Sequence, residues 1–180
     1  MDNWHSGLAL TYLEETKHSY QSLLDDRHFL DWGNQPQPLK SSRGLEAIPY
    51  CLLHAVEGVT SGAYVWHPPS RSLELLAASA SRQEASPLAL GQDLAAEASV
   101  LVCALCDLLP IVERLGNRGY RAAQLEAGLM GGRMYLAAYA QGLGATGLTF
   151  LDDDVTAYFA PHAADKSVMF LLAMGYTAHR

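Results

Sequence analysis

Two cysteines lie three residues apart, at Cys103 and Cys106, a spacing found in redox centres and in zinc sites. A structural zinc site needs a second pair of ligands at suitable spacing, and the sequence offers no Cys or His pair of that kind. Both cysteines fall within residues 99–106, an apolar run that predicts a strand, where residues three apart point to opposite faces. We therefore interpret them, together with Cys51, as thiols buried in the core.

The histidines and one run of aspartates are the other residues that could bind a metal ion. The seven histidines are scattered, and none lies two or four residues from another: His5, His18, His28, His54, His67, His162 and His179. A pair of ligands on one helix is therefore absent. Asp152, Asp153 and Asp154 offer carboxylates to a divalent cation, but acids at the start of a helix more often cap it and complement its dipole. We predict no metal site.

Gly142-Leu143-Gly144 follows a long helical segment and is the most informative of the short motifs. Two glycines let the backbone approach a planar ligand without a Cβ in the way, and free N–H groups there could donate to a ring nitrogen or carbonyl. The same residues are typical of a helix C-cap that leads into a strand. The motif alone leaves both interpretations open.

Composition excludes several classes of protein. Of 180 residues, 49% are hydrophobic and 17% charged, which excludes intrinsic disorder and matches one domain in length. The formal net charge of −7 argues against nucleic-acid binding. No apolar run approaches the ~20 residues that a membrane span requires, and the first residues lack the basic flank and apolar stretch of a signal peptide. We expect a cytoplasmic protein.

The elements that must position these residues follow from the hydrophobic pattern. Residues 1–49 are interpreted as an N-terminal arm, with a helix at 7–24 and a Pro-rich loop, and residues 50–180 as the folded domain. The predicted strands are 50–56, a hairpin of 63–66 with 73–76, then 99–106, 145–150 and 168–174. The predicted helices are 88–98, 120–141 and 152–159. This order indicates an α+β or α/β domain.

The long helix contains three interior glycines, Gly128, Gly131 and Gly132. Each costs about 1 kcal/mol relative to alanine, so the close approach of another backbone must offset them. One explanation is a central helix packed tightly inside a monomer, and the other is a helix at a symmetric dimer interface.

Several of these segments together resemble the nitroreductase superfamily, and more narrowly its SagB/ThcOx-type dehydrogenases. The motifs are Gly116-Asn117-Arg118-Gly119-Tyr120-Arg121, Leu125-Glu126-Ala127-Gly128, Tyr135-Leu136-Ala137-Ala138, Gly142-Leu143-Gly144 and Asp152-Asp153-Asp154. Residues 12–19, 30–32 and 61–66 with 73–75 resemble the same subfamily, so the resemblance spans most of the chain.

The resemblance implies a nitroreductase-like α+β fold: a mainly antiparallel sheet flanked by helices, in an intertwined homodimer that holds FMN at the subunit interface. It implies hydride transfer through flavin N5, with a small organic or peptide-derived substrate. Gly142, Leu143 and Gly144 would lie against the isoalloxazine, and Arg180, or less readily His179, would meet the FMN phosphate. The long helix would then form the dimer.

The chain departs from that family in two places. Relatives carry an arginine-rich segment that grips the phosphate and a Pro-Ser-x-Gly-Ala loop, whereas here Ile48-Pro49 leads directly into Tyr50, so the chain looks shortened. The Lys-Tyr pair of azoline oxidases is replaced by Arg114-Leu115, and leucine cannot transfer a proton. The alternative is a catalytically degenerate member with weak or no FMN binding, acting as a dimeric accessory or scaffold subunit.

Overall fold

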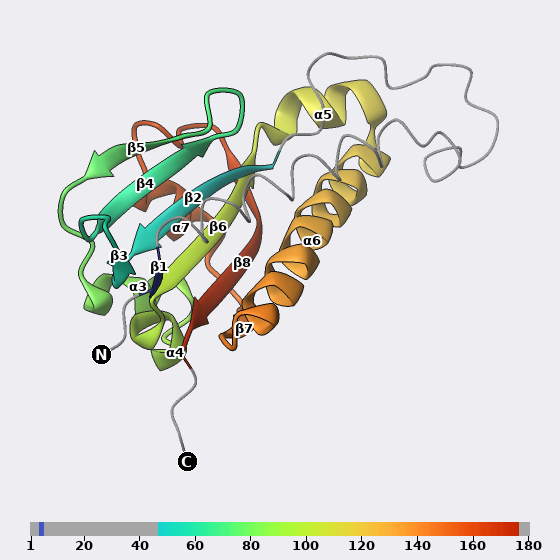
Figure 1. The fold of residues 1–180 in the computed structure, drawn as a ribbon. Coiled ribbons are helices and arrows are strands. Elements are labelled where there is room, and N and C mark those ends of the chain that lie inside the picture. The colour runs from blue at the N-terminus through green and yellow to red at the C-terminus, as the bar shows by residue number, and fades with distance from the viewer. Residues whose placement is uncertain (1–3, 6–46, 177–180) are drawn as a thin grey trace.

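The structure, a computed structural model, describes residues 4–5 and 47–176 and is built around a six-stranded sheet (Figure 1). Its strands are β2 (Ile48–Leu53), β4 (Gly62–His67), β5 (Ser72–Ala77), β6 (Val100–Cys106), β7 (Gly144–Gly147) and β8 (Ser167–Gly175). The order is β5-β4-β2-β6-β8-β7, and every neighbouring pair is antiparallel. A separate two-stranded parallel sheet joins β1 (Trp4–His5) to β3 (Val56–Glu57).

Helices cover both faces of this sheet. They are α3 (Arg82–Leu88), α4 (Asp93–Glu97), α5 (Leu108–Leu115), α6 (Asn117–Ala140) and α7 (Asp152–Tyr158). Met134 and Ala138 of α6 pack on one face against Cys51 and Val102. The other face packs against α3, α4 and α7. Strand β6 is buried along its whole length because it lies inside the sheet with helices on both sides, which explains its continuous apolar sequence.

The glycines of α6 fall into two classes. A Cβ on Gly131 would collide with the ring of Phe170 on β8, and one on Gly119 would lie 2.7 Å from the carbonyl oxygen of Ile111 in α5. These two glycines therefore permit close packing within the chain, as the first explanation predicts. A Cβ on Gly128 or Gly132 would meet no atom within 4 Å, so contacts within the described chain do not explain them.

Most predicted elements are confirmed, with shifts of a few residues at their ends. The hairpin forms as β4 and β5, the long helix as α6, and the last helix and strand as α7 and β8. The strand predicted at 99–106 is β6, and its two cysteines lie in separate clusters on opposite faces, as expected. The sheet also includes Ile48 and Pro49, residues that we assigned to the arm.

Three predicted elements differ from the structure. The helix at 88–98 is wrong as one element, because Leu90 and Gly91 adopt positive φ angles of 55° and 75° and separate α3 from α4. The capping box of Ser81 and Glu84 starts α3 earlier than predicted. The strand at 50–56 divides into β2 and β3, and the strand at 145–150 ends at Gly147.

The structure also contains an element that the sequence analysis missed. Helix α5 joins β6 to α6 and was not predicted. The helix predicted at 7–24 and the predicted phosphate ligand Arg180 lie outside the described residues. None of the described helices has the length and apolar character that crossing a bilayer requires.

Candidate functional site

The turn after α6 is the first candidate site, and its glycine has a conformational cause. Gly142 has a φ of 73°, a left-handed conformation that glycine adopts without strain. Its N–H donates to the carbonyl of Tyr139 at 3.0 Å, and the N–H of Leu143 donates to the carbonyl of Ala138 at 2.9 Å. These bonds end the helix as a glycine C-cap does. The suggestion that free N–H groups at the turn reach a ligand is therefore wrong for Gly142 and Leu143.

The turn is nevertheless open on its outer side. A Cβ on Gly142 would meet no atom of the described residues within 4 Å, while the side chain of Leu143 is buried and anchors the turn in the core. Tyr139, 57% exposed, borders it and donates from its hydroxyl to the carbonyl of Ala145 at 3.4 Å. Gly144 is half-buried and begins β7, which is an edge strand of the described sheet. It pairs with Gly175 of β8. The outer side of the turn is therefore formed by the backbone of Gly142 and bordered by the side chain of Tyr139.

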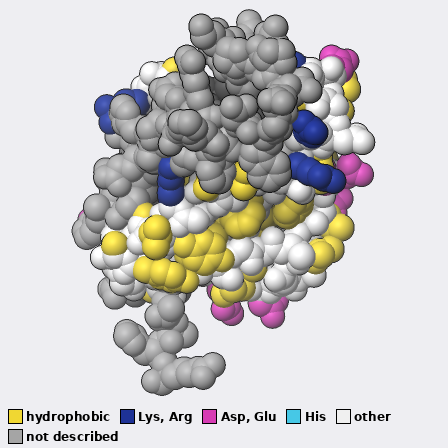
Figure 2. Space-filling view, turned by 90° about the vertical axis from the view of Figure 1, so that its right-hand side faces the viewer, with side chains coloured by type: hydrophobic (Ala, Val, Ile, Leu, Met, Phe, Trp, Pro, Cys, Tyr) yellow, Lys and Arg dark blue, Asp and Glu magenta, His cyan; other side chains and the backbone are white. Residues whose placement is uncertain are grey.

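An exposed apolar face leads along α6 to this turn. Leu125, Leu136 and Tyr139 are 45%, 71% and 57% exposed, and they recur at helical spacing with Gly128 and Gly132. Figure 2, which looks onto the side of the molecule where α6 lies, shows a band of hydrophobic side chains with Lys and Arg side chains beside it. A contiguous patch of large apolar side chains on an exposed face is typical of a surface that binds another protein or a ligand.

A second candidate site lies on the opposite face of the sheet, at the tip of the β4–β5 hairpin. In the strand register His67 faces Ser72 and Val65 faces Glu74, so His67 and Glu74 are diagonal neighbours on one face. The Nε2 atom of His67 lies 2.6 Å from Oε2 of Glu74. The two side chains form an ion pair when His67 is protonated and a hydrogen bond otherwise.

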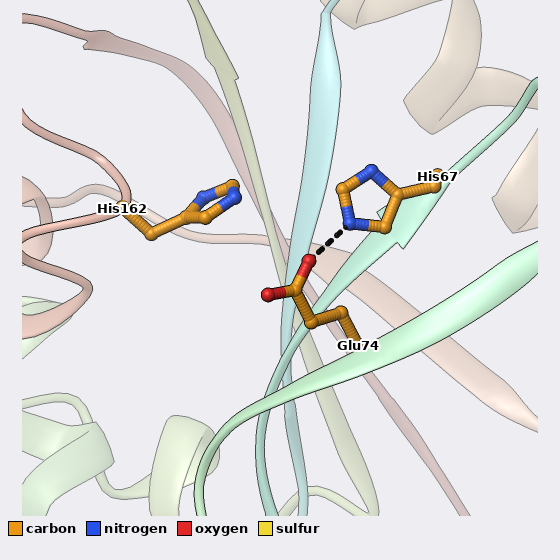
Figure 3. Close-up of side chains that lie close together, drawn as sticks. All are labelled: His67, Glu74 and His162. Atoms are coloured by element: carbon orange, nitrogen blue, oxygen red, sulfur yellow. Dashed lines mark hydrogen bonds and ion pairs between the residues drawn. The ribbon is translucent and has the colours of Figure 1, made fainter.

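The turn after α7 brings a third side chain, His162, to the same place. The carboxylate of Glu74 lies between the imidazole rings of His67 and His162 (Figure 3). The His and carboxylate atoms that could bind an ion all lie within 4.8 Å of one another. Sequence analysis missed this cluster because it compared histidines only with close sequence neighbours, although the predicted hairpin already placed His67 near Glu74.

Tyr50 on β2 holds the ring of His162 from the side of the sheet. Its hydroxyl lies 2.8 Å from Nδ1 of His162 and 3.3 Å from the carbonyl oxygen of the same residue. Burial, followed by the charges of Asp107 and Glu74, raises the pKa of Tyr50 well above its usual range, so the hydroxyl keeps its proton. The hydroxyl has a single proton, so both contacts are hydrogen bonds when it donates to the carbonyl and accepts from His162 in the tautomer with its proton on Nδ1.

The cysteines are buried in the core, and Asp152 forms a hydrogen bond that links two elements of the fold. Burial raises the pKa of Cys51 and, with smaller charge effects, that of Cys106 to about 12, and it raises the pKa of Cys103 further. All three are free, buried thiols, as predicted. Asp152 accepts a hydrogen bond from the N–H of Val168 at 2.7 Å and so joins α7 to β8.

Comparisons with known proteins agree on the fold. The model of the family described as "Nitroreductase family" matches residues 64–176. A protein described as a nitroreductase from Anabaena variabilis has a TM-score of 0.78 at 24% identity, over 98% of this chain and 35% of that chain. A chain of the Escherichia coli microcin synthetase McbBCD complex has a TM-score of 0.69 at 17% identity, over 99% of this chain and 66% of that one.

A third solved structure and a search of curated proteins complete the comparison. A protein described as a nitroreductase from Ralstonia eutropha has a TM-score of 0.60 at 19% identity, over 74% of this chain and 59% of that chain. This chain therefore spans about a third to two thirds of the length of these three relatives. No curated protein matches it.

Proposed function

The chain belongs to the nitroreductase family, and from this premise we propose that it is an FMN-dependent oxidoreductase of the SagB type, acting on a small organic or peptide-derived substrate. The observation that carries the proposal is the open turn after α6, where a Cβ on Gly142 would meet no atom within 4 Å in the part of the chain that the structure describes. FMN supplies hydride exchange at N5 when bound, and the protein supplies position and electrostatics.

The residues of the turn suit the ring of a flavin by shape. Gly142 leaves the outer surface free of side chain, and Tyr139 borders it. Gly144 begins the strand on the other side of the turn. The N–H groups of Gly142 and Leu143 donate to carbonyls of α6. These two residues would therefore contribute contact area to a bound ring and not hydrogen bonds from their N–H groups. Arg180 would meet the phosphate.

The second part of the proposal is that two copies of the chain pair through α6. Leu125, Leu136 and Tyr139 leave a large apolar area in water, and burial of that area would stabilise a dimer. Gly128 and Gly132 have open space beside them and would let a second backbone approach closely. Because the exposed face ends at the turn, the partner would cover the ring of a flavin bound there. A two-fold symmetric dimer uses the same surface patch of both copies, and the exposed face of α6 is a single patch of this kind.

A second candidate function, an accessory or scaffold subunit without catalysis, also has support. Leu115 stands where azoline oxidases carry a proton-transferring tyrosine, and it packs against a hydrophobic cluster. The arginine-rich segment of relatives is absent from the sequence. Loss of bidentate arginine contacts to a phosphate removes hydrogen bonds of about 1.5–3 kcal/mol each. Such a chain would retain the α6 dimer and bind FMN weakly or not at all.

Flavin binding separates the two functions. We expect the purified chain to be yellow, or to quench the fluorescence of added FMN with saturation at one FMN per chain. The variant Gly144→Leu places a large side chain at the start of β7, and we expect it to weaken FMN binding by about tenfold or more. Sedimentation should show the same dimer as in the wild type.

The control is Glu97→Leu, which adds the same side chain to the exposed surface of α4 on the opposite side of the sheet. It should bind FMN like the wild type. A colourless wild-type chain that takes up no added FMN would refute the oxidoreductase proposal and favour the accessory function. Equal FMN affinity in Gly144→Leu and wild type would refute the placement of the ring at the turn.

A further inference from the structure

We propose that His67, Glu74 and His162 form a binding site for a divalent zinc ion on the face of the sheet opposite α6. Two imidazole nitrogens and one carboxylate oxygen are a ligand set that zinc uses when it keeps one position open for water or another ligand. Imidazole ligands also disfavour Mg²⁺ and Ca²⁺, which prefer oxygen. The site is separate from the turn after α6, so it does not depend on the proposed flavin chemistry.

The spacing of the three ligands is close to what zinc needs. Their binding atoms lie within 4.8 Å of one another, and His67 and Glu74 already lie 2.6 Å apart. Around a tetrahedral zinc ion with bonds of about 2.0–2.1 Å, ligand atoms lie about 3.3 Å apart. The ion would therefore separate His67 from Glu74 slightly and draw His162 toward them. Small rotations of exposed side chains accomplish this without movement of the sheet.

The contacts of Tyr50 with His162 are a second observation in favour of the site. An ion pair between His67 and Glu74 alone does not explain why the ring of His162 is held beside them. The hydroxyl of Tyr50 lies 2.8 Å from Nδ1 of His162, and in the tautomer with its proton on Nδ1 the ring donates to this hydroxyl and keeps the Nε2 lone pair available for a metal. Metal-binding histidines usually have their second ring nitrogen fixed in this way by a neighbouring group. The hydroxyl also donates to the His162 carbonyl, so both the ring and its backbone are held.

Contacts within the chain position the residues on both sides of the site. Next to His162, Ala163 is fully buried and its N–H donates to the carbonyl of Phe159 at 3.1 Å. The ring of Phe159 packs on Tyr50, with centroids 5.1 Å apart. In the hairpin, the hydroxyls of Ser70 and Ser72 lie 2.8 Å apart. Little conformational entropy would be lost when the three ligands meet an ion.

The charge at the site also favours a cation. Glu74 carries a carboxylate at the centre of the cluster, and its charge and that of Asp107 act on Tyr50. Lys166 forms an ion pair with Asp107 at 2.6 Å, and the carboxylate of Glu74 pairs with His67. A zinc ion here would join the hairpin tip to the turn after α7, two segments far apart in the sequence.

Zinc binding to the full chain tests the proposal directly. After treatment with a chelator, the chain is titrated with zinc chloride in a calorimeter. We expect saturable binding of one zinc ion per chain, and visible absorption typical of tetrahedral coordination when Co²⁺ replaces zinc. A hundredfold excess of zinc over its dissociation constant should raise the melting temperature by about 5 °C or more.

Variants assign the binding to these residues. His162→Ala should weaken zinc binding by about a hundredfold and remove the Co²⁺ spectrum, and Glu74→Gln should weaken it by about tenfold or more. Tyr50→Phe retains the ring packing and removes only the hydroxyl, so zinc binding should fall by about tenfold. Glu113→Gln makes the same change as Glu74→Gln on the exposed surface of α5, and it should bind zinc like the wild type.

The results of the zinc titrations decide the proposal without reference to flavin binding. A wild-type chain with no saturable zinc binding would overturn the proposal, as would zinc binding that is equally tight in His162→Ala. Melting of each variant without zinc shows that it is folded, so that loss of binding is not loss of structure. Zinc binding in a chain that takes up no FMN would support this inference while refuting the flavin proposal, and the reverse result would separate them equally well.

Discussion

The turn after α6 and the cluster at the hairpin tip are two sites of different construction. The turn consists of consecutive residues, and its geometry comes from the backbone of Gly142 and from the helix that it ends. The cluster takes one side chain from β4, one from β5 and one from the turn after α7. The first would need a second copy of the chain and a cofactor to become a site. The second already has its ligands side by side in a single chain.

The comparison shows why a motif and a site are different things. A helix C-cap explains the conformation and the hydrogen bonds of Gly142 and Leu143 completely, so the motif by itself does not call for a ligand. The open surface beside it is what favours one. At the hairpin no motif exists, and the argument depends on distances between side chains. The first prediction below affects the face of α6 and the turn while leaving the hairpin unchanged, and the others test the packing and the pH dependence of the fold around them.

Among the remaining variants, the largest effect is expected from Leu136→Glu, which places a charge on the exposed face of α6. Leu136 is 71% exposed in the single chain, so this change should leave the fold intact. In the proposed dimer the charge would be buried, and we expect association to weaken by about thirtyfold or more. Sedimentation over a range of concentrations measures this. FMN uptake should fall with it, whereas zinc binding should stay unchanged.

The control for this variant is Leu94→Glu on α4, which is 48% exposed and lies on the other side of the sheet. It should associate like the wild type. If Leu136→Glu forms dimers as tightly as the control, α6 is not the dimer interface.

A smaller effect is expected from Gly131→Ala, which tests how α6 is seated on the sheet. Its Cβ would collide with the ring of Phe170, and such overpacking costs about 1–3 kcal/mol of the free energy of unfolding. Gly132→Ala, one residue further along, meets no atom of the described chain within 4 Å, so in the dissociated single chain it should raise that free energy by about 0.5–1 kcal/mol. Urea unfolding measures both. Equal effects of the two changes would contradict the packing described here.

The smallest effect concerns a histidine that belongs to neither site. Burial, followed by the charge of Arg82, lowers the pKa of His54 from its ordinary value of 6.5. As the pH falls below 6.5, the unfolded chain therefore binds a proton before the folded chain does. Stability should decrease toward acid through that window, and His54→Gln should remove this part of the decrease. Unfolding curves at several pH values give the slope, and equal slopes in both proteins would exclude His54 as the cause.

Much of the fold could be predicted from the sequence, because its signals are local. The apolar run of β6, the turn between β4 and β5, and the periodic pattern of α6 each indicate an element without reference to the rest of the chain. The predictions were less accurate where tertiary packing decides where a helix begins or ends. The helix predicted at 88–98 is divided by a turn at Leu90 and Gly91, and α5 starts directly after β6 to lead the chain into α6.

The sequence by itself determined the elements and the turn at Gly142, because backbone preferences and hydrophobic periods act over a few residues. It also carried the family resemblance, which the match over residues 64–176 supports. Only the tertiary structure decided which glycines of α6 pack against β8, and only it brought His162 to Tyr50, 112 residues away in the chain. Contacts between distant segments depend on how the sheet orders its strands, and no local pattern encodes that order.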